Sequence, residues 1–326
     1  MRPWLCMLGL LAACGGATPQ PDTPQSQPEP VVAAPTRPDP VALLPRETVG
    51  VVTVDVPLLR ASPHWPVLRD LYASSLSEAP ERRRALDELL EKAERVEQAL
   101  VAGGGSVPIE LGAVVVQGRF ERGDGARLLA QLADERAAAR MNPVQVEGRP
   151  GLGDGEAALV EVDQGLYLVG PYRRIRPPLR SPERPPALGG SVVRELLAQV
   201  PAEGAALHGW LDVPGGVDSL PVPAWVHEIL SVVEAVAARV DLSAGLDALL
   251  RARMSSPAAA DRVARELSAK VDTLAPSMIV RALGLDSVFS ALELNAAGGD
   301  VVVRLQLGVD ELAPIVEWLA RVAEAR

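Results

Sequence analysis

The chain has 326 residues, enough for about two domains of ordinary size. Hydrophobic residues make up 48% and charged residues 23%, a balance that excludes wholesale disorder. The 42 acidic residues outnumber the 32 basic ones, so the formal net charge is -10 and binding to nucleic acids is not expected.

Residues 1–13 have the features of a secretory signal peptide. Arg2 supplies a positive charge, and the apolar run at 4–13 is much shorter than the roughly 20 residues that span a bilayer. The run ends in Leu11-Ala12-Ala13-Cys14, which resembles the lipobox of bacterial lipoproteins. In that family the signal is cut before the cysteine, whose thiol is linked to diacylglycerol and whose new amino group is acylated.

The resemblance implies that Cys14 is the first residue of the mature chain and its lipid anchor in the cell envelope. Gly15 follows the cysteine, where an aspartate would favour the inner membrane, so the outer membrane of a Gram-negative bacterium is expected. An ordinary cleaved signal with an incidental cysteine is the alternative. Cys6 leaves with the signal, so no intrachain disulfide and no free thiol are expected in the mature chain.

A proline-rich tether is predicted next, over residues 14–41. Residues 17–40 contain eight prolines and few apolar side chains, which is typical of an extended, disordered spacer. At about 3.1 Å per residue, such a spacer reaches some 70 Å.

The first folded unit is predicted over residues 42–200. Its expected elements are a strand at 49–56, a helix with apolar spacing from Leu86 to Leu100, a strand at 111–120, a helix from Asp124 to about Arg140, strands at 144–147, 157–162 and 166–169, and a helix at 191–200. Residues 163–165 are expected to form a hairpin turn, and the glycines between 148 and 155 a flexible connection.

The second unit, residues 201–326, repeats this order. The segment 53–57 (TVDVP) has a counterpart at 210–214 (WLDVP). After it come a predicted helix at 225–239, a strand at 246–254, a helix capped by Ser256, a hairpin of strands at 288–294 and 301–307, and a helix that begins at Asp310. We therefore expect an internal duplication and an α+β fold, in which each unit is a mainly antiparallel sheet covered by helices.

The segment from Asp55 to Trp65 (DVPLLRASPHW) resembles uncharacterised lipoproteins of myxobacteria. The similarity covers the core in outline and implies no activity.

The sequence offers no catalytic constellation. It has no G-x-S-x-G nucleophile elbow and no S-x-x-K pattern, and its three histidines lack the spacing of metal ligands. No catalytic residue, metal or cofactor is predicted, and the protein is not expected to be an enzyme.

Two pairs of residues recur at matching positions of the two units. Asp55 and Asp212 end corresponding strands, so they either form turns or approach each other and share a proton or an ion. Trp65 and Trp225 follow them, either as core anchors or as stacking platforms for a sugar.

One basic segment departs from the acidic balance of the chain. It contains Arg173, Arg174, Arg176, Arg180 and Arg184. These arginines could contact anionic head groups, glycan phosphates or an acidic partner. The alternative is an exposed insertion in which prolines have broken a helix.

These observations favour a non-enzymatic, lipid-anchored envelope protein that binds another protein or a surface component. A lipoprotein that binds a small ligand or glycan in a cleft between the two units is the alternative. An envelope hydrolase with a dispersed carboxylate site is a third, less favoured reading.

Overall fold

The computed structural model describes residues 39–75, 80–103, 109–132, 139–181, 190–213, 222–278, 280, 285–313 and 315. Residues 1–38, which include the signal peptide, Cys14 and nearly all of the tether, lie outside the described residues, as does Arg184.

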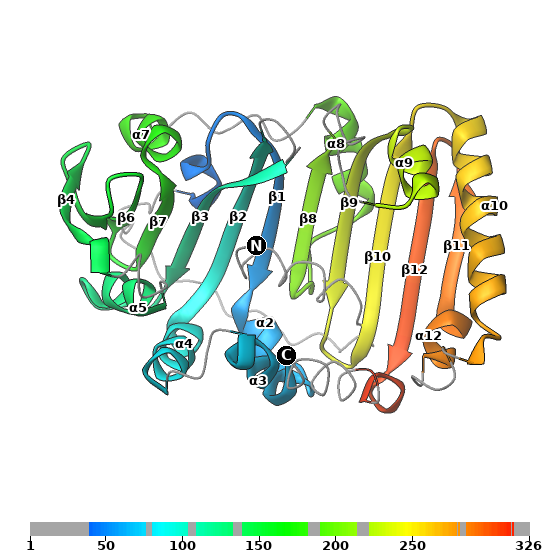
Figure 1. The fold of residues 1–326 in the computed structure, drawn as a ribbon, viewed down its shortest axis with the longest axis horizontal. Helices are drawn as coiled ribbons and strands as arrows, with labels where there is room; N and C mark the ends of the chain where they lie inside the picture. Colours follow the sequence, from blue (N-terminus) through cyan, green and yellow to red (C-terminus); the bar gives the residue numbers. More distant parts are fainter. Residues whose placement is uncertain are drawn as a thin grey trace, which may run out of the picture.

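The fold is α+β, as predicted, with one large antiparallel sheet of twelve strands (Figure 1). The strands are β1 (Thr48–Asp55), β2 (Ala93–Ala102), β3 (Ile109–Gly118), β4 (Asn142–Val146), β5 (Arg149–Gly153), β6 (Ala157–Asp163), β7 (Leu166–Pro171), β8 (Leu207–Asp212), β9 (Val233–Asp241), β10 (Gly245–Met254), β11 (Leu292–Ala297) and β12 (Asp300–Gly308). Their order across the sheet is β11-β12-β10-β9-β8-β1-β2-β3-β7-β6-β5-β4. The expectation of one sheet per unit is therefore wrong, because β1 pairs with β8 and the sheet continues across both units.

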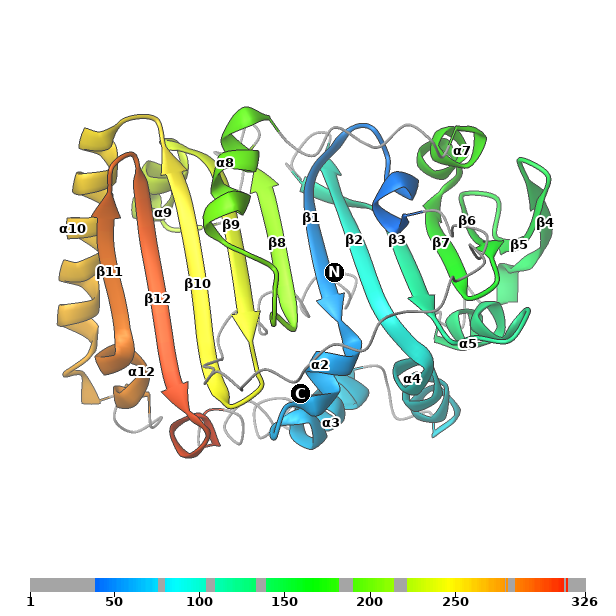
Figure 2. The ribbon, with the colours of Figure 1, turned by 180° about the vertical axis from the view of Figure 1, so that it is seen from behind.

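Helices cover both faces of the sheet. The back face, nearest the viewer in Figure 2, packs against η2 (Pro40–Leu43), α7 (Tyr172–Arg180) and α8 (Ser191–Gln199). The front face, nearest the viewer in Figure 1, packs against α2 (Val56–Ala61), α3 (Trp65–Ser75), α4 (Pro80–Lys92), α5 (Asp124–Leu132), α9 (Ala224–Leu230), α10 (Pro257–Leu274) and α12 (Asp286–Ala291). The core therefore consists of two apolar layers, one on each side of the sheet.

The two halves of the sheet have the same pairing order. From the seam outward, the first half runs β1-β2-β3-β7-β6 and the second runs β8-β9-β10-β12-β11. The first half has in addition the β4–β5 hairpin, which pairs with the outer edge of β6.

The seam between β1 and β8 depends on two glycines. A Cβ at Gly209 would stand 2.7 Å from the Val51 carbonyl oxygen, and a Cβ at Gly50 would stand 2.9 Å from the Trp210 carbonyl oxygen. A larger residue at either position would push the two strands apart.

The predicted helices at 86–100 and 225–239 are each wrong in their second part. The chain leaves α4 at Lys92 and enters β2 directly, and it leaves α9 at Leu230 and enters β9 after two residues. Both strands are rich in alanine and charged residues, which favour helix locally. Pairing with a strand on each side overrides that preference.

Three further segments differ from the prediction. Residues 286–291 are helix α12, and the strand begins only at Leu292. The glycine-rich segment at 148–155 contains strand β5. Helix α7 continues through Pro177 and Pro178, so prolines have not broken it. The cap at Ser256 is confirmed, since its hydroxyl accepts from the Ala259 N–H at 3.2 Å.

Candidate functional site

Asp55 and Asp212 are not brought together. Asp55 caps α2, where its Oδ1 accepts the Leu58 N–H at 2.9 Å. Leu211, next to Asp212, pairs with Gly50, five residues from Asp55, so the two carboxylates lie at opposite ends of the seam, about 17 Å apart or more. The turn role fits Asp55, and the alternative of a proton or ion shared by the pair is wrong, because antiparallel pairing of equivalent strands places equivalent ends at opposite edges of the sheet.

Trp65 and Trp225 are separated in the same way. Trp65 begins α3 and packs, half-buried, against a core cluster that includes Leu207 and Val240. Trp225 lies in α9, which packs on the front face near the opposite ends of the strands, and is 41% exposed (Figure 1). The Lys270 ammonium lies over its ring, 4.6 Å from the centroid. The two indoles do not line one site.

Most of the described arginines of the basic segment are paired within the protein. Arg174 is buried and donates to Glu110 Oε2 at 2.9 Å and to the Leu111 carbonyl at 3.3 Å. Arg180 donates to Glu147 Oε2 at 2.7 Å, and Arg176 lies 3.8 Å from the same carboxylate.

Arg173, in contrast, is exposed and lines a surface hollow together with Glu47 and Glu110. The described part of the segment is therefore less basic than its arginine count indicates, since Glu110 and Glu147 offset much of the charge.

A polar cluster lies on the back face at the seam. The Glu97 carboxyl is fully buried, accepts from Thr53 Oγ1 at 2.6 Å and pairs with Arg95 at 2.5 Å. Burial raises the pKa of Glu97, which the Thr53 hydrogen bond and Arg95 oppose. His208 lies on β8, opposite Thr53 across the seam. Burial lowers the pKa of His208, whose Nε2 lies 3.0 Å from the Val200 carbonyl oxygen.

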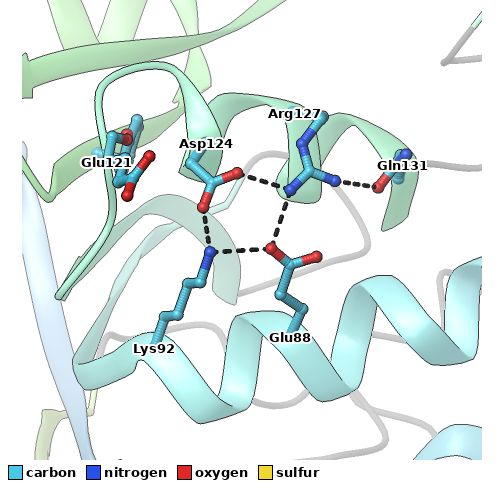
Figure 3. Close-up of polar contacts among 7 residues, drawn as sticks. Glu88, Lys92, Glu121, Asp124, Arg127 and Gln131 are labelled. Carbon is cyan, nitrogen blue, oxygen red and sulfur yellow. Dashed lines mark hydrogen bonds and ion pairs between the residues drawn. The ribbon is translucent and has the colours of Figure 1, made fainter.

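A second polar cluster joins α4 to α5 (Figure 3). Lys92 pairs with Asp124 and, at 2.9 Å, with Glu88. Arg127 pairs with the same two carboxylates, at 2.6 Å from Asp124 and 2.9 Å from Glu88, and completes a closed ring of alternating charges. The hydrogen bond from Lys92 is the main reason that the pKa values of both carboxyls are lowered. With every charge matched, this ring fixes the two helices rather than presenting a reactive group.

In the second half, two buried carboxylates are each held between two arginines on the back face. Asp247 pairs with Arg239 at 2.9 Å and with Arg304 at 3.5 Å. Asp300 pairs with Arg251 at 3.2 Å and with Arg253. Within the described residues, no group of three or more His, Cys, Asp or Glu side chains is placed to hold a metal ion.

The front face contains an apolar surface that no described helix covers. It comprises Val52, Leu100, Leu111, Leu211 and Ala238, which we call the central apolar face. Cross-strand pairing places these five side chains on one side of the sheet, and all are partly buried rather than fully buried. Their neighbours Val54, Val96 and Val236 pack against flanking helices, whereas none of the five belongs to a core cluster.

The central apolar face spans the seam and is bordered by α4 and α5 on one side and by α9 and α10 on the other (Figure 1). Two hollows of the described surface lie elsewhere, beside α10 and β11 and at the start of α7. A small apolar ligand needs a pocket that encloses most of its surface. A flat apolar surface instead fits a macromolecule that supplies its own bulk.

Sequence reasoning missed this surface. The alternation in β1 and β8 marks the residues on the front face, but the same pattern describes a fully covered strand. The glycines at 50 and 209, opposite a leucine and a valine, were the one available sign of a flat area at the seam.

Comparisons with known proteins concern the fold. No protein-family model and no curated protein matches the chain. Among solved structures, crystal forms III and IV of TP0453 each align with a TM-score of 0.48 and 11% identity, covering 88% and 89% of this chain and 98% and 96% of theirs. Crystal form I of TP0453 aligns with a TM-score of 0.44 and 10% identity, covering 86% of this chain and 97% of its own. None of the helices in the described ranges is long and apolar enough to cross a bilayer.

Proposed function

We propose that the chain is a non-enzymatic, lipid-anchored protein of the cell envelope that binds another protein through the central apolar face. Cys14, in the lipobox Leu11-Ala12-Ala13-Cys14, is the site of lipid attachment. Gly15 favours the outer membrane of a Gram-negative bacterium, and the tether holds the folded part away from the lipid surface.

The central apolar face, which no described helix covers, carries this proposal. Leu100, Leu111 and Leu211 present apolar side chains on the front face, where the neighbouring Val54, Val96 and Val236 pack against helices. Apolar surface that stays in contact with water costs about 25 cal/mol per Å², so a partner that covers it gains free energy.

An amphipathic helix is the element that fits this surface best. On the same face, α10 already packs through Ala260, Val263 and Ala264 onto β10 and β12. The flanking helices α4, α5, α9 and α10 rise above the sheet and would keep a second flat sheet at a distance. Glycine and alanine at the centre allow a helix to approach closely.

We also propose that the two halves arose by internal duplication. The identical pairing orders β1-β2-β3-β7-β6 and β8-β9-β10-β12-β11 support this origin, as does the shared D-V-P sequence that begins at the last residue of β1 and of β8.

Lipid attachment is tested by metabolic labelling with palmitate and by membrane fractionation. Cys14→Ala is expected to abolish labelling and to release the protein from membranes, whereas Cys6→Ala, within the signal, keeps both. Labelled Cys14→Ala protein in the membrane fraction would contradict the proposed anchor.

Partner binding is tested by affinity capture from detergent-solubilised envelopes, followed by mass spectrometry. Wild-type protein is expected to retain one dominant protein that Leu211→Asp loses. Ala198→Asp, on the exposed side of α8, is the matched control and is expected to retain it. If Leu211→Asp captures the same proteins as the wild type, the central apolar face is not the binding surface.

A further inference from the structure

The two edges of the sheet differ in how they are protected. At one end, β4 contains Pro143, which lacks a backbone N–H and so hinders pairing with another strand. At the other end, β11 has six residues, Leu292–Ala297, and no proline. Among the described residues, β11 pairs only with β12, so its outer backbone groups have no strand partner.

The first half of the sheet indicates what such an edge accepts. By pairing order, β6 is the counterpart of β11. The outer edge of β6 is occupied by β5, which pairs with it in antiparallel register at Gly151–Gly153. The corresponding place beside β11 holds no strand of the described chain.

A surface hollow lies along the free edge of β11. Its β11 side is formed by Leu294, Asn295 and Ala296. Its other side is formed by residues of one face of α10, namely Asp261, Ala264, Arg265, Ser268, Ala269 and Asp272. Both views place α10 alongside β11 at the outer margin of the molecule (Figures 1 and 2).

The lengths of the two walls match. Asp261 and Asp272 are eleven residues apart, which is about 16 Å along a helix. Five residues of extended chain span a similar distance, which is almost the length of β11. A strand edge beside a parallel-lying helix is the arrangement that binds an extended peptide by strand addition.

We propose that β11 and α10 form a docking groove for an extended segment of a partner protein, which adds a thirteenth strand to the sheet. Backbone hydrogen bonds to β11 hold the segment, and its alternate side chains face α10. Asp261 and Asp272 stand at the two ends of the groove, and within the described residues neither forms an ion pair. The two carboxylates outnumber the one arginine of the groove, Arg265, so the groove favours a basic segment. Basic side chains four residues apart lie on one face of an extended segment, about 13 Å from each other, and their flexible ends reach both carboxylates.

A second copy of this chain fits the groove less well. Antiparallel pairing of β11 with β11 of another copy would bring both α10 helices to the same face of the joined sheet. Since α10 lies at the outer margin beside β11, the two helices would compete for the same space.

The groove is tested with the full mature chain in detergent micelles and an immobilised array of random decapeptides. We expect the bound peptides to be enriched in Lys or Arg at positions i and i+4 and depleted in proline between them. For a selected peptide, hydrogen exchange is expected to slow within residues 292–297, and Ala269→Trp, which fills the groove, weakens binding by about tenfold or more. Arg262→Trp, an exposed position of α10 outside the groove, leaves binding unchanged.

Other results would overturn the proposal. Binding that survives Ala269→Trp, or protection that falls outside 292–297, would place the peptide elsewhere. Concentration-dependent dimers that Ala269→Trp abolishes would identify a second copy as the occupant. The groove is independent of the central apolar face, so Leu211→Asp is expected to leave peptide binding intact.

Discussion

Replacing Leu211 by alanine tests whether the central apolar face is uncovered in the free protein. A fully buried leucine loses about 2–5 kcal/mol of unfolding free energy when it is truncated to alanine, because apolar burial is lost and a cavity remains. Leu211 is only partly buried and belongs to no core cluster, so its truncation removes less buried area than that of a fully buried leucine. We expect a cost of about 1–2 kcal/mol.

Leu168→Ala is the matched control. Leu168 also lies in a strand, β7, but is 0% exposed within the core on the back face. Both substitutions remove the same number of methyl groups and carry a similar strand-propensity cost. The difference between their losses of unfolding free energy therefore reports how far each leucine side chain is covered by the rest of the protein. We expect Leu168→Ala to cost about 2–5 kcal/mol.

The assay is urea unfolding followed by circular dichroism, with unfolding free energies compared at equal m-values. Equal costs for Leu211→Ala and Leu168→Ala would refute the reasoning, because they would show that Leu211 is covered in the free protein.

Three further predictions concern other elements. Because the folded pKa of Glu97 is raised, the stability of the wild type relative to Glu97→Gln is expected to fall as the pH rises from about 4 towards neutrality; a difference independent of pH in urea unfolding would contradict this. Ser256→Ala is expected to lower the unfolding free energy by about 1 kcal/mol through loss of the α10 cap, with Ser255→Ala near neutral, and equal effects would exclude the cap. Gly209→Ala is expected to cost about 1–3 kcal/mol and to speed amide exchange in β1 and β8, and unchanged exchange there would contradict close contact at the seam.

Much of the fold could be predicted because local patterns agree with tertiary structure. The apolar, β-branched run of β1 and the Ser256-Pro257 start of α10 each indicate one conformation only. The strands β2 and β9 could not be predicted in the same way. Their alanines and charges favour helix, and only pairing with β1, β3, β8 and β10 makes them strands.

The candidate sites depended on long-range geometry to an even greater degree. The sequence showed that Asp55 and Asp212 recur, but whether they meet depends on the direction in which β1 and β8 pair. The charge of the arginine segment could be counted, whereas its neutralisation by Glu110 and Glu147 depends on the chain returning from 30 or more residues away. The free edge of β11 follows from the order of the strands in the sheet, which cannot be predicted from a local sequence pattern.

Site-specific photo-cross-linking in native membranes tests the central claim most directly. A benzophenone side chain is placed at position 211, on the central apolar face, and in a second variant at position 198, on the exposed side of α8. We predict that the probe at 211 cross-links to one dominant protein in the membrane fraction, that the probe at 198 does not, and that Cys14→Ala abolishes the product. Cross-links only to lipid at 211, or identical products from both positions, would contradict a membrane-anchored protein that binds a partner through its central apolar face.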